Sequence, residues 1–127
     1  TFDFLGYALK KSLRYDVIII DPPSFASGSR KKGIRPWSSV DDYAKLIHEA
    51  SRILAPRGLI LASTNTQELC RPGRLEREIT KGLGRPPRWI KLPDPPIDFA
   101  RERERFAARA FTIEPASSPS RPPTGAR

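Results

Sequence analysis

A short apolar segment that ends at two consecutive prolines is the feature of the sequence that most constrains the fold. A strand is expected over 15–20, and Asp21-Pro22-Pro23 follows it directly. Its apolar residues stand at consecutive positions, which is typical of a strand covered on both faces, as in a parallel sheet. Proline has no backbone N–H and a fixed φ, so neither proline continues the strand. The pattern therefore predicts a buried strand whose carboxyl end carries an aspartate.

The segments around this strand alternate between helix and strand. A polar, basic loop over 24–36 leads to a helix that Ser38 or Ser39 caps, with Asp42 in the capping-box position three residues after Ser39. Apolar residues at helical spacing continue to Leu54, and Pro56 with Gly58 is expected to end the helix before a buried strand over 59–63. Further elements are expected at 2–13 (helix), 72–84 (helix), 88–92 (strand) and 106–113 (strand).

This order of elements predicts an α/β fold with a mostly parallel sheet and crossover helices. The last strand has no helix before it, which allows it to return antiparallel. In such sheets ligands bind beyond the carboxyl ends of the strands. That edge is expected to carry Asp21 after the first strand and Ser63-Thr64-Asn65 after the second.

The Asp21-Pro22-Pro23 segment has the chemistry of a hydrogen-bond acceptor site. The two prolines remove two donors, so the neighbouring carbonyls are expected to lack local partners. A planar amine could donate to these acceptors, while the ring of Phe25 covers the face of a base. The competing interpretation is a simple strand terminator, and the position after an apolar strand favours the site. The same tripeptide over 94–96 follows Leu92-Pro93 and is interpreted as a rigid loop.

The charge and the cysteine content limit the class of protein that this chain can be. The net charge of +9 favours polyanionic partners, although a solvated basic surface explains it equally well. Part of this charge lies in a loop with one aromatic residue, which consists of Arg30, Lys31, Lys32, Arg35 and Trp37. Such a loop could bind RNA through phosphate contacts and base stacking, and a loop that is only solvated is the open alternative. The sequence has no apolar run long enough to predict a membrane span. With one cysteine and one histidine, neither an internal disulfide nor a metal site is expected. No secretory leader is visible, so a cytoplasmic protein is expected.

Three segments in order resemble one enzyme family. The stretch over 15–26 resembles the fourth-strand motif of class I S-adenosylmethionine-dependent methyltransferases. It is closest to the large-subunit (23S) ribosomal RNA branch, in which one residue stands between the second proline and the phenylalanine, as Ser24 does here. The stretch over 60–65 is similar to that branch's fifth strand, which ends in Ser-Asn-Asn, and Asp98-Phe99-Ala100-Arg101 resembles a segment before its last strand.

The resemblance implies the carboxyl-terminal half of a Rossmann-like methyltransferase domain over 1–114. A Pro- and Ser-rich tail over 115–127 is expected to be disordered, because it has too little apolar surface to bury. The family holds its cofactor through a glycine-rich turn after the first strand, and no such turn precedes Asp21. We therefore expect the cofactor-binding strands to be missing from this chain, and the chain by itself to be inactive.

The resemblance also implies a cofactor, a substrate and site residues. Asp21 and the carbonyl of Pro22 would face the methyl group of S-adenosylmethionine and the reacting base. The implied catalytic residues are Asp21, Pro22, Pro23 and Phe25. The resemblance also supports Asn65 and Arg101 as substrate-binding residues, beside the loop cations Arg30, Lys31, Lys32 and Arg35 that the charge pattern suggests. The implied substrate is a base nitrogen of ribosomal RNA. Two alternatives stay open: a methyltransferase that acts on protein or DNA, and a non-catalytic RNA-binding remnant.

Cys70 and His48 are the remaining candidates for chemistry. Methylation of a pyrimidine carbon needs a thiolate nucleophile, which the ribosomal enzymes of that chemistry place at the end of the fifth strand. Ser63 and Thr64 occupy those positions here, so Cys70 is interpreted as incidental and the target as a nitrogen. His48 falls on the polar face of its expected helix, which indicates a surface histidine.

Overall fold

The computed structural model describes residues 1–94, 96 and 105–113. The helices are α1 (Phe2–Lys10), α2 (Ser39–Ser51) and α3 (Arg74–Leu83), and the strands are β1 (Tyr15–Ile20), β2 (Phe25–Ala26), β3 (Trp37–Ser38), β4 (Leu54–Thr64), β5 (Arg88–Ile90) and β6 (Ala107–Thr112). The expected segment over 98–101, with its Arg101, lies outside the described residues, as does the tail over 115–127.

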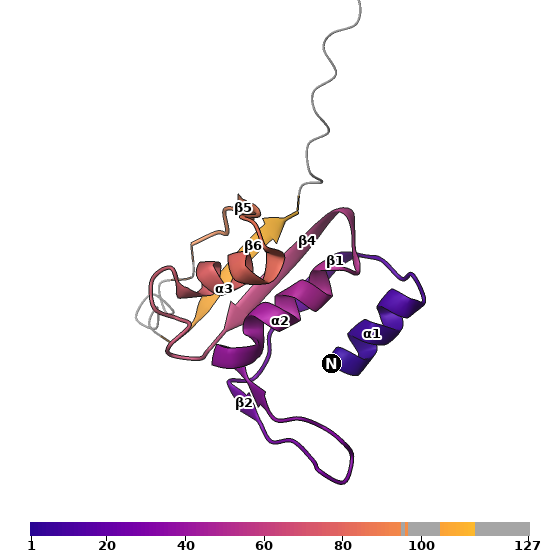
Figure 1. The fold of residues 1–127 in the computed structure, drawn as a ribbon. Helices are drawn as coiled ribbons and strands as arrows, with labels where there is room; N and C mark the ends of the chain where they lie inside the picture. Colours follow the sequence, from indigo (N-terminus) through magenta and orange to yellow (C-terminus); the bar gives the residue numbers. More distant parts are fainter. Residues whose placement is uncertain (95, 97–104, 114–127) are drawn as a thin grey trace, which may run out of the picture.

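The main sheet has the strand order β1-β4-β6-β5 (Figure 1). β1 pairs parallel with β4, and β6 runs antiparallel to both β4 and β5. β1, β4 and β5 therefore share one direction, and the predicted α/β fold with an antiparallel last strand is confirmed. Ile20 is in register with Ala62, so Asp21, the first residue after β1, lies beside Ser63 near the end of β4.

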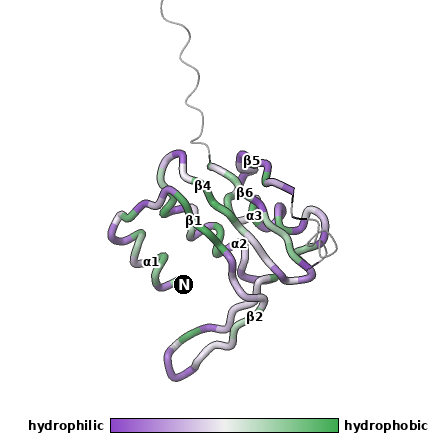
Figure 2. The backbone as a smooth tube through the Cα atoms, turned by 180° about the vertical axis from the view of Figure 1, so that it is seen from behind, coloured by the Kyte–Doolittle hydropathy of each residue, from purple (hydrophilic) through white to green (hydrophobic). Residues whose placement is uncertain are grey.

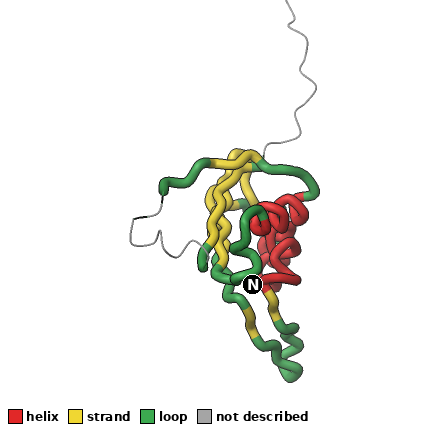
Figure 3. Tube along the Cα trace, turned by 90° about the vertical axis from the view of Figure 1, so that its left-hand side faces the viewer, coloured by secondary structure: helices red, strands yellow, loops and turns green. Residues whose placement is uncertain are grey.

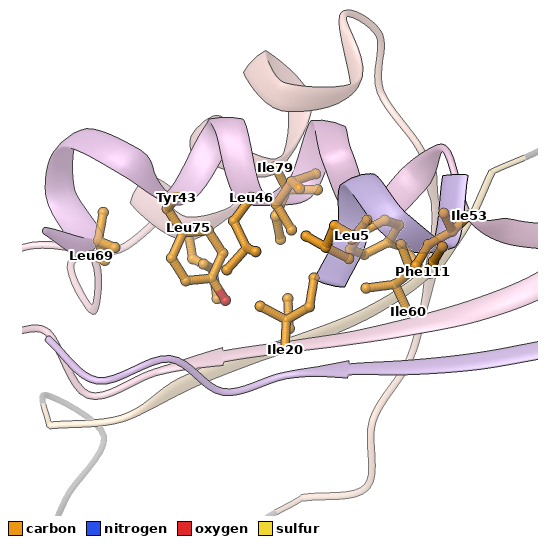
Figure 4. Close-up of a cluster of buried hydrophobic side chains, with 14 residues drawn as sticks. Leu5, Ile20, Tyr43, Leu46, Ile53, Ile60, Leu69, Leu75, Ile79 and Phe111 are labelled. Carbon is orange, nitrogen blue, oxygen red and sulfur yellow. The ribbon is translucent and has the colours of Figure 1, made fainter. Parts of the chain in front are cut away.

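The three helices of the described residues lie on one face of the sheet (Figure 3). Apolar side chains from both layers meet between them, as the close-up in Figure 4 shows. Fully buried members include Tyr43 and Ile47 of α2, Leu75 and Ile79 of α3, Ile60 of β4 and Phe111 of β6. α3 also packs closely on α2, because a Cβ at Gly82 would lie 2.3 Å from the carbonyl oxygen of Ala44.

The opposite face of β1 is open in the described part of the chain, which corrects the expectation of a strand covered on both faces. Val17 and Ile19 are 57% and 68% exposed, whereas Ile20 points into the core. The green stretch of β1 in Figure 2 marks this apolar strand. The reason is the one-sided placement of the helices, which cover only alternate residues of the strand.

The boundary between α2 and β4 differs from the expectation. The helix ends at Ser51 and β4 already begins at Leu54, so Pro56 and Gly58 lie inside the strand rather than at a helix end. The register with β1 jumps from Tyr15↔Leu54 to Val17↔Leu59, and Arg57 within the jump has φ +64°. This irregularity accommodates a proline, which cannot donate to a regular ladder.

The segment over 24–36 is part of a β-hairpin, which corrects the prediction of an irregular loop. β2 and β3 pair antiparallel, and beyond them the backbones of Ser29 and Ile34 exchange hydrogen bonds of 2.8 and 2.9 Å. Gly28 permits this pairing, since a Cβ there would lie 2.4 Å from the Ile34 carbonyl oxygen. We call residues 25–38 the basic hairpin. It projects from the edge of the sheet where β1 ends (Figure 1).

Candidate functional site

Two side-chain hydrogen bonds join the ends of β1 and β4. The hydroxyl of Ser63 donates to Oδ1 of Asp21 at 2.7 Å. One step further out, the hydroxyl of Ser24 donates to Oδ1 of Asn65 at 2.9 Å. The structure thus brings together the aspartate and the asparagine that the sequence places at this edge.

The carbonyl of Pro23 is held by two donors from the chain itself. It accepts a hydrogen bond from Nε1 of Trp37 at 2.8 Å and one from the hydroxyl of Ser39 at 2.9 Å. The Pro23 carbonyl thus has no partner nearby in the sequence, as expected, but donors 14 and 16 residues away occupy it, so it is not left free for a ligand. The segment after β1 is held in place through a carbonyl oxygen that accepts hydrogen bonds, because its prolines have no backbone N–H to donate.

The two aromatic residues beside this segment have different environments. Trp37 is half-buried, and its ring lies 6.0 Å from the ring of Phe2. Its indole N–H donates to the carbonyl of Pro23, so Trp37 helps to hold the segment in place. Phe25 is 66% exposed, so its ring is open to solvent.

The start of α2 differs in detail from the expected capping box. Ser38 is the N-cap residue, and its backbone N–H donates to the carboxylate of Asp42 at 2.9 Å. The side chain of Ser39 is turned away from the helix, to the carbonyl of Pro23. One end of α2 is thereby tied to the candidate site.

Tyr43 and Ser63 form a buried support that the sequence analysis did not assign to the site. The Tyr43 hydroxyl donates to the carbonyl oxygen of Ser63 at 2.7 Å, and Tyr43 is fully buried. Burial, and then the nearby Asp21 carboxylate, raise the pKa of the phenol well above its ordinary range. The sequence did contain a signal for this contact, because Tyr43 lies on the apolar face of its helix. A buried tyrosine hydroxyl usually finds a hydrogen-bond partner.

The basic side chains of the hairpin divide into two groups. Lys32 and Arg35 line the same open groove as Asp21, along β1 and the start of α1. Arg30 and Lys31 do not line that groove, and Lys31 is exposed.

Cys70 and His48 have different environments. The Cys70 thiol is half-buried and donates to the carbonyl oxygen of Thr64 at 3.6 Å, and burial raises its pKa. His48 is exposed on α2, as the sequence indicated.

Among the described residues, the histidine, cysteine and acidic side chains form no group suited to a metal ion. The described helices include none with the length and apolar character of a membrane span.

Comparisons with known proteins agree with this architecture, although no protein-family model matches the chain. A ribosomal RNA large subunit methyltransferase K/L of Pseudoalteromonas atlantica is 31% identical over 111 residues, which are 87% of this chain and 15% of that protein. YwbD of Bacillus subtilis, provisionally assigned as a ribosomal RNA large subunit methyltransferase, is 46% identical over 65 residues, or 51% of this chain and 15% of that protein. The crystal structure of SMU.776, a provisionally assigned methyltransferase complexed with SAH, matches with a TM-score of 0.74 and 34% identity over 89% of this chain and 30% of that one.

The fold and these matches define the chain as part of a class I S-adenosylmethionine-dependent methyltransferase domain. Within that class, the chain is similar to the large-subunit ribosomal RNA methyltransferases, which confirms the predicted resemblance. The chain spans only 15% of the length of these two curated relatives and 30% of the solved structure.

Proposed function

We propose that the protein carrying this chain transfers a methyl group from S-adenosylmethionine to a base nitrogen of ribosomal RNA. The observation that carries the proposal is the fixed Asp21-Pro22-Pro23 segment at the shared end of β1 and β4, with Phe25 exposed beside it. The named relatives are ribosomal RNA methyltransferases, and one solved relative holds SAH, the form the cofactor takes after it has given up its methyl group.

The residues at this edge fit such a cofactor. The sulfonium of S-adenosylmethionine is positively charged and supplies an electrophilic methyl carbon. Asp21 provides a carboxylate, and the Pro22 carbonyl provides a neutral acceptor at the end of a strand. Both groups favour a cation over an anion at this position.

Methyl transfer is a displacement that requires nitrogen, carbon and sulfur to lie in line, so the chief contribution of the protein is orientation. Asp21 accepts a hydrogen bond from the N–H of the target nitrogen and thereby aims its lone pair. Phe25 stacks on the face of the base. The bound cofactor would supply the methyl group and keep the sulfur as the leaving group. Asp21 would stabilise the proton of the target nitrogen, which becomes more acidic on methylation, until that proton leaves to solvent.

The basic hairpin supports RNA as the substrate class. Its cations can contact phosphates, while an exposed aromatic stacks on an unpaired base. The four cations are Arg30, Lys31, Lys32 and Arg35. Asn65 lies at the same edge and adds a polar contact to the base.

The test uses the whole protein that carries this chain, with S-adenosylmethionine labelled in the methyl group. Large-subunit ribosomal RNA is offered beside a DNA of the same sequence and a ribosomal protein mixture, and the labelled nucleotide is identified after digestion. Label in RNA is expected, and label in DNA or protein alone would overturn the substrate class. Asp21→Ala should lower the rate far more than it lowers cofactor affinity, because its contact with the target nitrogen is made in the transition state.

A non-catalytic RNA-binding function is the second candidate, because the cations of the hairpin need no cofactor to bind phosphates. RNA binding by the whole protein without any methyl transfer to RNA would favour it. The chain alone is expected to show no cofactor binding by calorimetry, and micromolar binding would contradict the expectation of an incomplete cofactor site.

A further inference from the structure

Three residues from separate elements form a connected series of hydrogen bonds that ends on Asp21. Tyr43 of α2 donates its hydroxyl to the carbonyl of Ser63 at 2.7 Å, and Ser63 of β4 donates its own hydroxyl to Asp21 Oδ1 at 2.7 Å. Tyr43 is fully buried and Ser63 is 8% exposed, whereas Asp21 lies at the exposed end of β1. The series therefore runs from the core to the candidate site.

The backbone fixes where the Ser63 hydroxyl can be. Ser63 pairs with Ala108 of β6, and its carbonyl is bonded to Tyr43, so little freedom is left besides the rotation of its side chain. The hydroxyl has one proton to donate. Its oxygen lies 2.7 Å from Asp21 Oδ1 but 3.4 Å from the carbonyl oxygen of Ile20, so the proton is directed to the carboxylate.

We propose that Ser63 is a positioning residue for Asp21. It holds Oδ1 and so presents Oδ2 to the hydrogen-bond donor of the substrate. Tyr43 acts one step further back, because its phenol holds the peptide group of Ser63 in place. This inference rests on the proposed function for its consequence in catalysis, but the orientation of Asp21 can be measured without any substrate.

The first experiment measures the side-chain rotamer of Asp21 by NMR, from its three-bond couplings across χ1, in the 127-residue chain. The wild type should show one rotamer. Ser63→Ala should give averaged couplings, and Ser63→Thr, which keeps the hydroxyl, should restore the single rotamer. Ser51→Ala is the matched control, because that hydroxyl bonds the His48 carbonyl at the far end of α2. A single Asp21 rotamer in Ser63→Ala would overturn the proposal.

The second experiment measures methyl transfer to RNA by the whole protein. Ser63→Ala should lower kcat roughly 10- to 100-fold, the order expected when a reacting group is held about 1 Å out of place. The KM for the cofactor should stay within about twofold, and Ser63→Thr should recover most of the rate. Tyr43→Phe should give a smaller loss of kcat, because it leaves the Ser63 hydroxyl in place. A wild-type kcat in Ser63→Ala would overturn the proposal.

The two experiments separate failure of this inference from failure of the proposed function. If the wild-type protein methylates no RNA, the proposed function fails, while the rotamer measurement still decides whether Ser63 orients Asp21. If RNA is methylated but Asp21 keeps one rotamer without the Ser63 hydroxyl, the proposed function stands and the positioning role fails.

Discussion

The indole N–H of Trp37 donates to the carbonyl oxygen of Pro23 at 2.8 Å, although the two residues are 14 positions apart in the sequence. The bond ties the returning strand of the basic hairpin to the segment that carries Asp21. It also accounts for a tryptophan in a polar stretch: the ring is half-buried against Phe2, and only its donor reaches the site.

Trp37→Phe should therefore loosen the hairpin without unfolding the domain. The variant keeps an aromatic ring but loses one hydrogen bond, which is worth about 1 kcal/mol. We expect faster amide hydrogen exchange at Ser39, Ser29 and Ile34, whose N–H groups bond within this region. Trp89→Phe is the control, since Trp89 packs on Phe111 at the other end of the sheet. Unchanged exchange in Trp37→Phe would show that the bond does not hold the hairpin.

Gly82 and Gly6 give opposite predictions for the same substitution. Gly82→Ala should destabilise the protein by about 1–3 kcal/mol, because the new Cβ would lie 2.3 Å from the Ala44 carbonyl oxygen and force α2 and α3 apart. Gly6→Ala should stabilise the chain by about 0.5–1 kcal/mol, because Gly6 lies within α1 with nothing within 4 Å of the added carbon. Urea unfolding measures both, and equal effects would contradict the close packing of α3 on α2.

The sequence was sufficient to predict elements whose local and tertiary preferences agree. The apolar run of β1, the amphipathic face of α2 and the glycine at the end of α3 all indicated the right element. The antiparallel direction of β6 agrees with the expectation that a strand without a preceding helix can return antiparallel. Pro56 and Gly58 were misleading, because tertiary pairing with β1 extends β4 through an irregular stretch that local propensity marks as a break.

The candidate site could be predicted only in part. The sequence located Asp21 and Asn65 at one edge, because the ends of parallel strands coincide there. The supports of these residues come from far along the chain: Ser63 reaches Asp21 across 42 positions, and Tyr43 reaches Ser63 across 20. No local pattern encodes such a bond, since it depends on the register between β1 and β4 and on the placement of α2 over the sheet.

The basic hairpin gives a prediction for RNA binding. Neutralising Arg30, Lys31, Lys32 and Arg35 to Gln should weaken binding of single-stranded RNA by the chain. The slope of log K against log salt should become shallower by about 0.7 for each phosphate that the hairpin no longer neutralises. Neutralising Lys10 and Lys11 at the end of α1 is the control, and it should leave the slope unchanged. An unchanged slope in the hairpin variant would mean that these cations are only solvated.

Tyr43 gives a prediction for alkaline stability. Burial, and then Asp21, raise the pKa of the folded phenol above the ordinary value of 10.0, whereas the unfolded chain ionises near that value. The stability contributed by protonated Tyr43 is therefore fully present below pH 10.0 and is lost as the pH rises toward the folded pKa. Above pH 10.0, the free energy of unfolding of the wild type should fall more steeply than that of Tyr43→Phe, by up to about 1.4 kcal/mol per pH unit.

Urea unfolding across the alkaline range measures this difference. Tyr7→Phe is the matched control, because Tyr7 is 54% exposed on α1, and it should keep the wild-type slope. Parallel slopes for the wild type and Tyr43→Phe would show that the phenol is not held in its protonated form.

Cys70 tests the assignment of the target to a nitrogen. Its thiol lies at the end of β4 next to the Thr64 carbonyl, and burial raises its pKa, so little of the reactive thiolate is present at neutral pH. Iodoacetamide should therefore alkylate Cys70 in the folded chain more slowly than free cysteine at neutral pH, with the rate rising at alkaline pH. A fast reaction at neutral pH would contradict the raised pKa of this half-buried thiol.

In the whole protein, Cys70→Ser should leave the methylation rate near that of the wild type, because a nitrogen nucleophile needs no covalent bond to the enzyme. Asp21→Ala should lower the rate strongly in the same assay. The reverse pattern, with Cys70→Ser inactive and Asp21→Ala mild, would require a thiolate that adds to a pyrimidine ring before the methyl group is transferred to carbon. We expect the first pattern, because the hydroxyl of Ser63 at the end of β4 is bonded to Asp21 and the thiol of Cys70 is bonded to a backbone carbonyl.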